Sequence, residues 1–121
     1  MEKTVWELCA DALKTHDIDV YPPANKTGEC KKEYVVLKKD GAAQVGEYSS
    51  QNNYYTFMMY VPKAMYTQLE RFKKIVTDII STDLYPMLMP TGQETPDFYD
   101  DSVKAHMVSV TYRNSVRNNH L

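Results

Sequence analysis

The chain has 121 residues, of which 43% are hydrophobic and 25% are charged, a balance typical of one folded domain and unlike that of a disordered chain. Its formal net charge of -2 argues against a general nucleic-acid binder, which would carry a basic patch. This net charge is still compatible with a protein that lets nucleic acid slide past without binding it tightly. We therefore expect a single domain over residues 1–121.

The first predicted element is a helix that starts at about residue 5. Thr4 and Glu7 have the spacing of a capping box, in which each side chain bonds the backbone amide of the other residue. Apolar side chains then recur at helical spacing at Val5, Leu8, Cys9, Ala12 and Leu13. The prolines in segment 21–23 end the regular structure. The start lacks the apolar run of a signal peptide, and no segment approaches the roughly 20 apolar residues of a membrane helix, so we expect a cytoplasmic protein.

Three strands are predicted next. Residues 34–38 are apolar and β-branched, and the following Asp40-Gly41 pair is a hairpin signal. A weaker return strand covers residues 43–49, and a turn follows at residues 51–53. Residues 54–61 form the strongest strand, and because they are apolar on both faces, we expect this strand to be central in its sheet.

The second half of the chain predicts a helix and one more strand. Residues 64–80 carry an apolar stripe at helical spacing. Residues 82–102 are rich in proline and acids and read as an irregular loop, and residues 103–112 alternate as a last strand. Residues 114–121 are predicted to be a flexible tail. The order α-β-β-β-α-β predicts a two-layer α+β fold, with a four-stranded, mainly antiparallel sheet packed by two helices.

Residues with catalytic or metal-binding side chains lack the spacing that such chemistry needs. His16, His106 and His120 are far apart, so we interpret His16 as suited to a helix C-terminus and His106 as a half-buried strand residue. Neither a Gly-x-Ser-x-Gly elbow nor a phosphate-binding glycine loop is present. The acids of segment 94–101 favour a solvated or salt-bridging loop over a calcium site. We expect no enzymatic activity, no metal and no cofactor.

The two cysteines, Cys9 and Cys30, predict free thiols. Cys9 falls on the buried face of the first helix, and Cys30 falls in a polar segment. One disulfide between them is an open alternative, but nothing in their spacing requires it, and two free thiols in a reducing compartment are favoured.

The content of tyrosine and methionine indicates a protein interface. The chain has ten tyrosines and seven methionines, more than one small core readily buries. Both residue types are enriched where proteins meet, although any single tyrosine could equally pack on the sheet. The set as a whole favours a protein that assembles with other proteins.

The layout of nearly the whole chain resembles that of a known family. A first helix ends in the extended VYPP segment, and YVVLKKDGAAQVGEYS leads directly into NNYYTFMMYV. The helix KAMYTQLERFKKIVTDII follows, and then a loop that ends in DFYDDSVKAHMVSVTYR. In this arrangement the chain resembles the tail terminator, or tail completion, proteins of long-tailed bacteriophages and phage-derived tail particles.

The resemblance implies a structural role in virion assembly. Such proteins form a ring, commonly a hexamer, on the end of a completed tail tube, where the ring stops tube growth and provides the surface that joins the tail to the head. The implied partners are further copies of the chain, the tail tube protein and the head-tail connector or neck proteins, with no membrane. DNA would pass through the lumen as cargo. The implied location is the neck end of the virion tail, after assembly in the bacterial host cytoplasm.

Two exposed loops are the predicted contact regions. One is the tip of the predicted hairpin, and the other is the irregular loop, in which two aromatic residues could anchor among acids. Two arginines of the last strand and tail are predicted charge partners for those acids on an adjacent subunit. The predicted interface residues are Lys39, Asp40, Gly41, Asp97, Phe98, Tyr99, Asp100, Asp101, Arg113 and Arg117.

Three other functions stay open at the level of sequence. The first is a head-tail connector or neck protein that forms a ring of different symmetry. The second is a small monomeric adaptor or ligand-binding domain that uses the tyrosine-rich sheet. The third, an enzyme of unfamiliar type, is the least favoured, because no constellation of catalytic residues supports it.

Overall fold

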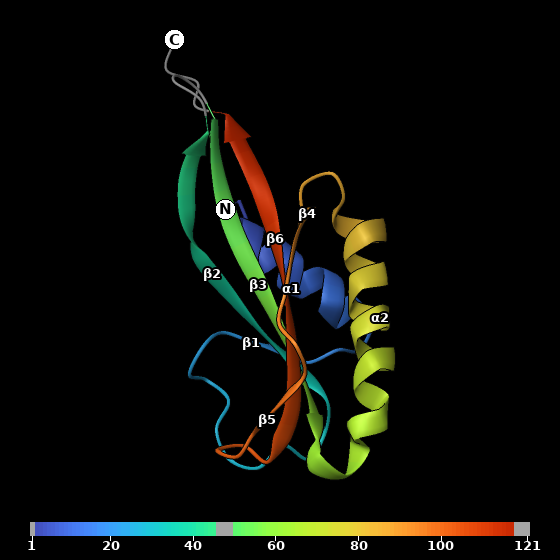
Figure 1. Cartoon of the computed structure of the whole chain (residues 1–121). Helices are drawn as coiled ribbons and strands as arrows, with labels where there is room; N and C mark the ends of the chain where they lie inside the picture. The colour runs from blue at the N-terminus through green and yellow to red at the C-terminus, as the bar shows by residue number, and fades with distance from the viewer. Residues whose placement is uncertain (1, 46–49, 118–121) are drawn as a thin grey trace.

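Two helices lie against one face of a six-stranded sheet in the computed structural model, which describes residues 2–45 and 50–117 (Figure 1). The helical layer contains α1 (Val5–Thr15) and α2 (Leu69–Ile79), with the 3-10 segment η1 (Lys63–Gln68) before α2 and the π-helical turn η2 (Ile80–Leu84) after it. The strands are β1 (Val20–Tyr21), β2 (Tyr34–Val45), β3 (Ser50–Pro62), β4 (Met89–Glu94), β5 (Phe98–Asp100) and β6 (Ala105–Arg117).

The sheet formed by the described residues has the order β1-β2-β3-β6-β4, and β5 also pairs with β6. β1 and β2 are parallel, and the other pairs are antiparallel. The predicted α+β class with two helices is confirmed, but the predicted four-stranded sheet is wrong, because this part of the chain forms six strands. Strands β1 and β5 have only two and three residues, too few for the alternation from which strands are predicted. β4 has six residues, but Pro90 and Gly92 within it are typical of a loop.

β2 continues through the Asp40-Gly41 pair, where the sequence predicts a hairpin turn. Lys39 pairs with Tyr55 and Gly41 pairs with Tyr54, so Asp40 is an extra residue in β2. Gly41 has a φ of 133°, a backbone conformation that other residues rarely adopt. The Asp-Gly pair therefore marks a β-bulge and not a turn.

The predicted three-strand meander is consequently two long strands. Residues 43–45 of the predicted return strand continue β2, and residues 46–49 lie outside the described residues. Residues 51–53, predicted to be a turn, lie within β3. β3 pairs with β2 on one side and β6 on the other, which confirms the central position predicted for residues 54–61.

Helix α1 begins with the predicted capping box. The Thr4 hydroxyl accepts a hydrogen bond from the Glu7 amide at 3.1 Å, and the Glu7 carboxylate accepts one from the Thr4 amide at 2.9 Å. Each bond satisfies an amide that the first turn leaves unbonded. At the other end, His16 is the C-cap residue, and its Nε2 lies 3.0 Å from Asp83 Oδ2 in η2. This contact joins the end of α1 to the turn after α2.

The predicted helix over residues 64–80 is α-helical only in its middle. The buried residues of α2 have the predicted helical spacing, and they are Leu69, Phe72, Val76 and Ile79. Met65 and Ile75, which the sequence places in the same stripe, are exposed. Met65 has a non-helical backbone in η1, and Ile75 lies at the edge of the stripe.

The core lies between the helices and the sheet. Alternate residues of the two central strands point into it, namely Phe57, Met59 and Val61 of β3 and Val108, Val110 and Tyr112 of β6. On β6 this confirms the alternation that the sequence predicts. The Trp6 indole donates a hydrogen bond to the Leu37 carbonyl at 2.7 Å and so ties α1 to β2.

β6 is longer than the predicted strand over residues 103–112. Residues 114–117, predicted as part of a flexible tail, belong to β6, and residues 118–121, which include His120, lie outside the described residues. Asn114 is buried, and its side-chain amide donates to the Met87 carbonyl at 2.9 Å. Segment 82–102, predicted to be irregular, supplies β4 and β5, because the edge of β6 provides backbone partners that need no apolar pattern.

Replacing Phe57 by alanine is expected to lower the free energy of unfolding by about 3–5 kcal/mol, because the ring is fully buried and its loss leaves a cavity. Phe98→Ala is the matched control, since Phe98 is 45% exposed. Its loss should cost less than about 1 kcal/mol. Urea denaturation followed by circular dichroism measures both variants, and equal losses would contradict the assigned core.

Candidate assembly surfaces

A polar groove crosses the face of the sheet that the helices leave uncovered. The groove has a volume of about 650 Å³ and is lined by Asp40, Tyr54, Pro90, Thr91, Gln93, Thr111 and Arg113. These residues come from β2, β3, β4 and β6. Tyr54, Thr111 and Arg113 face away from the helices because strand side chains alternate: each is next to a core residue of its strand, Tyr55, Val110 or Tyr112. We call these seven residues the polar groove.

A row of side-chain contacts supports the groove. The Thr56 hydroxyl donates a hydrogen bond to the Asp40 carboxylate and lies 2.9 Å from the Thr111 hydroxyl. Lys38 Nζ lies 3.5 Å from Asp40 Oδ1. Thr56 is only 8% exposed, so these bonds satisfy a polar group that water hardly reaches. The bulge in β2 thus holds the Asp40 carboxylate against β3.

Arg113 is the positively charged side chain of the groove. Among the described residues, no carboxylate forms an ion pair with it. Its Nη2 lies 3.9 Å from Met89 Sδ, a weak acceptor. Lys38 pairs with Asp40, so Arg113 is the charge of the groove that is left for an external group. A guanidinium binds a carboxylate through two parallel hydrogen bonds, which makes an acidic group a suitable ligand for this groove.

A second surface lies where β5 pairs with the lower end of β6, below β4 in Figure 1. Phe98, Tyr99 and Asp100 form β5, and Asp97 and Asp101 flank it. Phe98 is an exposed large apolar side chain among these acids. We call residues 97–101 the acidic edge.

Neighbouring donors orient the three carboxylates of the acidic edge. Tyr66 binds Asp97 at 3.0 Å, Ser102 binds Asp100 at 2.6 Å, and Lys104 binds Asp101 at 3.1 Å. Such contacts between exposed groups hold a carboxylate in place but leave it accessible to a partner, because water still reaches it.

An aromatic cluster supports the acidic edge from behind. The half-buried His106 ring has its centroid 4.7 Å from that of Tyr66 and 5.2 Å from that of Tyr99. Lys63 Nζ lies 5.8 Å from the centre of the Tyr99 ring. The predicted half-buried position of His106 is confirmed, and the ring packs between two tyrosines.

The prediction that residues 39–41 form an exposed hairpin tip is wrong. All three lie within β2, and the bulge separates them onto different faces. Lys39 pairs with Tyr55, a core residue on the helical side, whereas Asp40 contacts Thr56 on the helix-free side. A hairpin signal and a bulge signal are alike in sequence, because both need glycine in an unusual backbone conformation.

The structure brings together Asp40 and Arg113 of the predicted interface residues, and it places the acids of segment 97–101 elsewhere. Met107 pairs with Phe98 of the acidic edge. A strand rises about 3.3 Å per residue, so Met107 and Arg113 are about 20 Å apart along β6. Arg117 is the last residue of β6, and its side chain lies outside what the structure describes.

Sequence reasoning misses most of the groove. Tyr54, Gln93 and Thr111 line it, and Thr56 supports it, without any motif that connects them. The available signal is a hydroxyl inside an apolar strand, since Thr56 interrupts YYTFMMYV and Thr111 interrupts VSVTYR. Such a hydroxyl needs a partner when the strand is central in its sheet.

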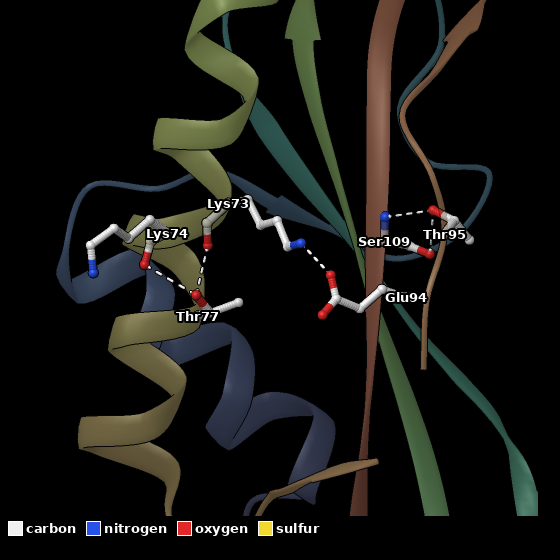
Figure 2. A network of polar contacts seen from close by, with 6 residues as sticks. All are labelled: Lys73, Lys74, Thr77, Glu94, Thr95 and Ser109. Carbon is white, nitrogen blue, oxygen red and sulfur yellow. Dashed lines mark hydrogen bonds and ion pairs between the residues drawn. The ribbon is translucent and has the colours of Figure 1, made fainter. Parts of the chain in front are cut away.

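Polar contacts fix the segment between the two surfaces to the helix and to the sheet (Figure 2). Lys73 of α2 pairs with Glu94 at the end of β4. The Thr95 hydroxyl accepts a hydrogen bond from the Ser109 amide at 2.9 Å, and the Thr95 amide donates to the Ser109 carbonyl at 3.0 Å. The chain therefore leaves β4 and enters β5 along a defined path.

Both cysteines are free thiols, as the sequence predicts, and both are buried. Burial raises the pKa of Cys9 to about 12 and also raises the pKa of Cys30. The sequence places Cys30 in a polar loop, yet it is buried beside Tyr34 and Ala105. Its amide donates to the Val103 carbonyl at 2.7 Å, a contact distant in sequence.

Within residues 2–45 and 50–117, no three or more histidine, cysteine, aspartate or glutamate side chains are grouped as a metal site. Over the same residues, no helix has the length and apolar character needed to cross a membrane. Models of known protein families give no match to this chain, and neither do curated proteins.

The contact between Tyr66 and Asp97 predicts a pH dependence within the acidic edge. The hydrogen bond to the Asp97 carboxylate, and then its negative charge, raise the pKa of Tyr66 above the ordinary value of 10.0. The stabilisation from this bond is therefore present below pH 10 and is lost as the pH rises through the folded-state pKa.

Asp97→Asn is expected to lower the pKa of Tyr66 toward 10.0, because the variant removes the carboxylate that opposes ionisation. Titration of the Tyr66 ring carbon by NMR measures this shift. Asp83→Asn is the control, since Asp83 contacts His16 instead. An unchanged Tyr66 pKa in Asp97→Asn would exclude the contact.

Proposed function

We propose that this chain is a structural assembly protein, not an enzyme, whose copies join head to tail in a ring. In the proposed assembly the ring, a hexamer in keeping with the family resemblance, caps the end of a phage tail tube. It stops tube growth and offers the surface that joins the tail to the head. The observation that supports head-to-tail contact is the separation of the polar groove and the acidic edge along β6.

The unpaired cation of the groove and the carboxylates of the acidic edge have opposite charge and cannot meet within one copy. The polar groove presents Arg113, which has no carboxylate partner among the described residues, and the acidic edge presents three carboxylates about 20 Å away along β6. A second copy can bring its acidic edge to the groove. A contact between two different surfaces is heterologous, and it closes into a ring when the rotation between copies divides a full turn.

Phe98 is the proposed apolar anchor of this contact. It is exposed within the acidic edge, and interfaces gain most of their affinity from a few aromatic or arginine residues surrounded by polar ones. On the other copy, Tyr54 and Pro90 give the groove an apolar part beside Arg113. The acids would then pair with the guanidinium while the ring packs on these side chains.

We propose that copies meet through side chains and not through a continued sheet. The open edge of β2 carries Lys38, Lys39 and Asp40 together with the bulge. The outer strand β4 contains Pro90 and a register shift between Pro90 and Glu94. Charges, prolines and bulges are the usual devices by which edge strands avoid pairing with another chain.

The remaining partners follow from the proposed ring. One side would match the last ring of the tail tube protein, and the other would present a different surface to connector or neck proteins. DNA would pass through the lumen as cargo, and the net charge of -2 suits a pore that does not retain it. The ring would act at the neck end of the virion tail after assembly in the host cytoplasm.

Two alternatives remain as second proposals. A connector or neck ring of different symmetry would use the same two surfaces. A monomeric adaptor or binding domain would use the polar groove for a ligand, and its volume of about 650 Å³ falls in the range of small-molecule sites. A connector ring would differ from the terminator in symmetry and in binding to tube ends. A monomeric binding domain would differ from it in mass.

The protein is expected to form closed rings when mixed with tail tube protein, because the tube end aligns the copies. Analytical ultracentrifugation gives the mass, and negative-stain microscopy shows whether rings cap the tubes and shorten them. A ring that forms but does not bind the tube ends would favour the proposal of a connector or neck protein. A strict monomer at high concentration that leaves tubes uncapped would count against both ring proposals.

Reversing the charge on either surface is expected to prevent assembly. Arg113→Asp and Asp101→Arg each place like charges across the contact and should weaken association at least about tenfold. An equal mixture of the two variants restores opposite charges at every contact of an alternating ring. A closed ring can be rescued in this way only if it has an even number of subunits, as a hexamer has, and the sedimentation mass of the mixture then gives the number.

The control for this experiment is Lys74→Asp, a reversal on the outer face of α2, where Lys74 contacts Asp78. It should leave assembly unchanged. Sedimentation velocity of each variant and of the mixture provides the measurement. Rings that form normally with Arg113→Asp alone would exclude the groove from the contact.

A further inference from the structure

Two tyrosine rings form a corner on the helix-free face, where β1 pairs with the start of β2. Tyr21 of β1 and Tyr34 of β2 have ring centroids 5.7 Å apart and planes at 81°. The ammonium of Lys26 lies over both rings, 5.5 Å from the centre of Tyr21 and 5.6 Å from that of Tyr34. The cation is thus equidistant from two perpendicular π faces.

The surroundings of the corner favour a bound cation. Tyr34 is buried, and Tyr60 stacks on it with a centroid distance of 4.9 Å. Burial, and then the negative charge of Asp100, raise the pKa of Tyr60, so this ring stays neutral near pH 7 with a carboxylate nearby. Neutral aromatic faces in a partly desolvated site attract ammonium groups most strongly.

We propose that Tyr21 and Tyr34 form a binding site for alkylammonium cations and that Lys26 is its resident occupant. Lys26 belongs to the connection between β1 and β2, residues 22–33. Binding of its ammonium holds this connection against the sheet, where Cys30 is only 2% exposed. The site does not depend on ring assembly and goes beyond the proposed function.

The accessibility of Cys30 reports whether the site is occupied. Lys26→Met keeps the alkyl side chain but removes the cation, so Cys30 should react with a maleimide about three- to tenfold faster than in the wild type when the two rates are compared at equal thiolate fraction. This comparison is needed because the Lys26 charge also lowers the pKa of Cys30. Lys26→Arg keeps the cation and should react at nearly the wild-type rate. Cys9 lies on the buried face of α1, in the main core, and should stay unreacted, which separates local opening from unfolding.

A second pair of variants tests the rings without changing Lys26. Tyr21→Leu removes one π face and should match Lys26→Met in the rate of Cys30 labelling. Tyr21→Phe keeps the face and should match the wild type. Equal rates for Tyr21→Leu and Tyr21→Phe would overturn the site, as would a wild-type rate for Lys26→Met.

Direct binding is tested with tetramethylammonium chloride on Lys26→Met. The added cation should shift the NMR signals of the Tyr21 and Tyr34 rings and slow the labelling of Cys30, whereas sodium chloride at the same concentration should not. The wild-type protein, in which Lys26 fills the site, should respond less. Identical responses to the two salts would overturn the assignment.

Discussion

β3 is hydrogen-bonded to β2 on one side and to β6 on the other, and the register of these pairings decides which side chains meet. Because side chains alternate along a strand, Phe57 enters the core while Thr56 faces away from the helices. A slip by one residue would expose Phe57 and bury Thr56 under the helical layer. The apolar core therefore stabilises the register, and the register places the polar groove.

The bulge in β2 modifies this arrangement at one point. With the extra residue, Asp40 and Gly41 both lie on the helix-free side, where strict alternation would separate them. The Asp40 carboxylate is then held by Thr56 and Lys38. Arg113, across the groove, keeps its charge available for an external carboxylate, and this availability underlies the proposed contact between copies.

β6 connects the two assembly surfaces. Its upper part carries Arg113 in the polar groove, and its lower part pairs with β5 in the acidic edge. Both surfaces sit on one strand of a bonded sheet, so their separation is fixed and a head-to-tail arrangement has a defined geometry. Tyr60 of β3 pairs with Met107 of β6 and stacks on Tyr34 of the alkylammonium site, so this site is linked to β6 through β3.

Local patterns in the sequence were sufficient to predict the capping box at Thr4, the buried stripe of α2 and the alternation of β6. Each depends on residues within a few positions of one another, and the physical cause is equally local. The α+β class follows from these elements, because each has one apolar face that must be covered. The candidate acids and arginines could also be named, since charge and loop composition are visible in the sequence.

Only the tertiary structure decided how these residues combine. The Asp40-Gly41 pair became a bulge because β3 continues beside it, and the weakly patterned segments at β1, β4 and β5 became strands because bonded neighbours satisfy their backbones. Cys30 is buried through contacts with residues far along the chain. The sequence by itself determined which side chains are apolar, charged or aromatic. The pairing of distant strands determined which of them share a surface, because that pairing is set by the packing of the whole core.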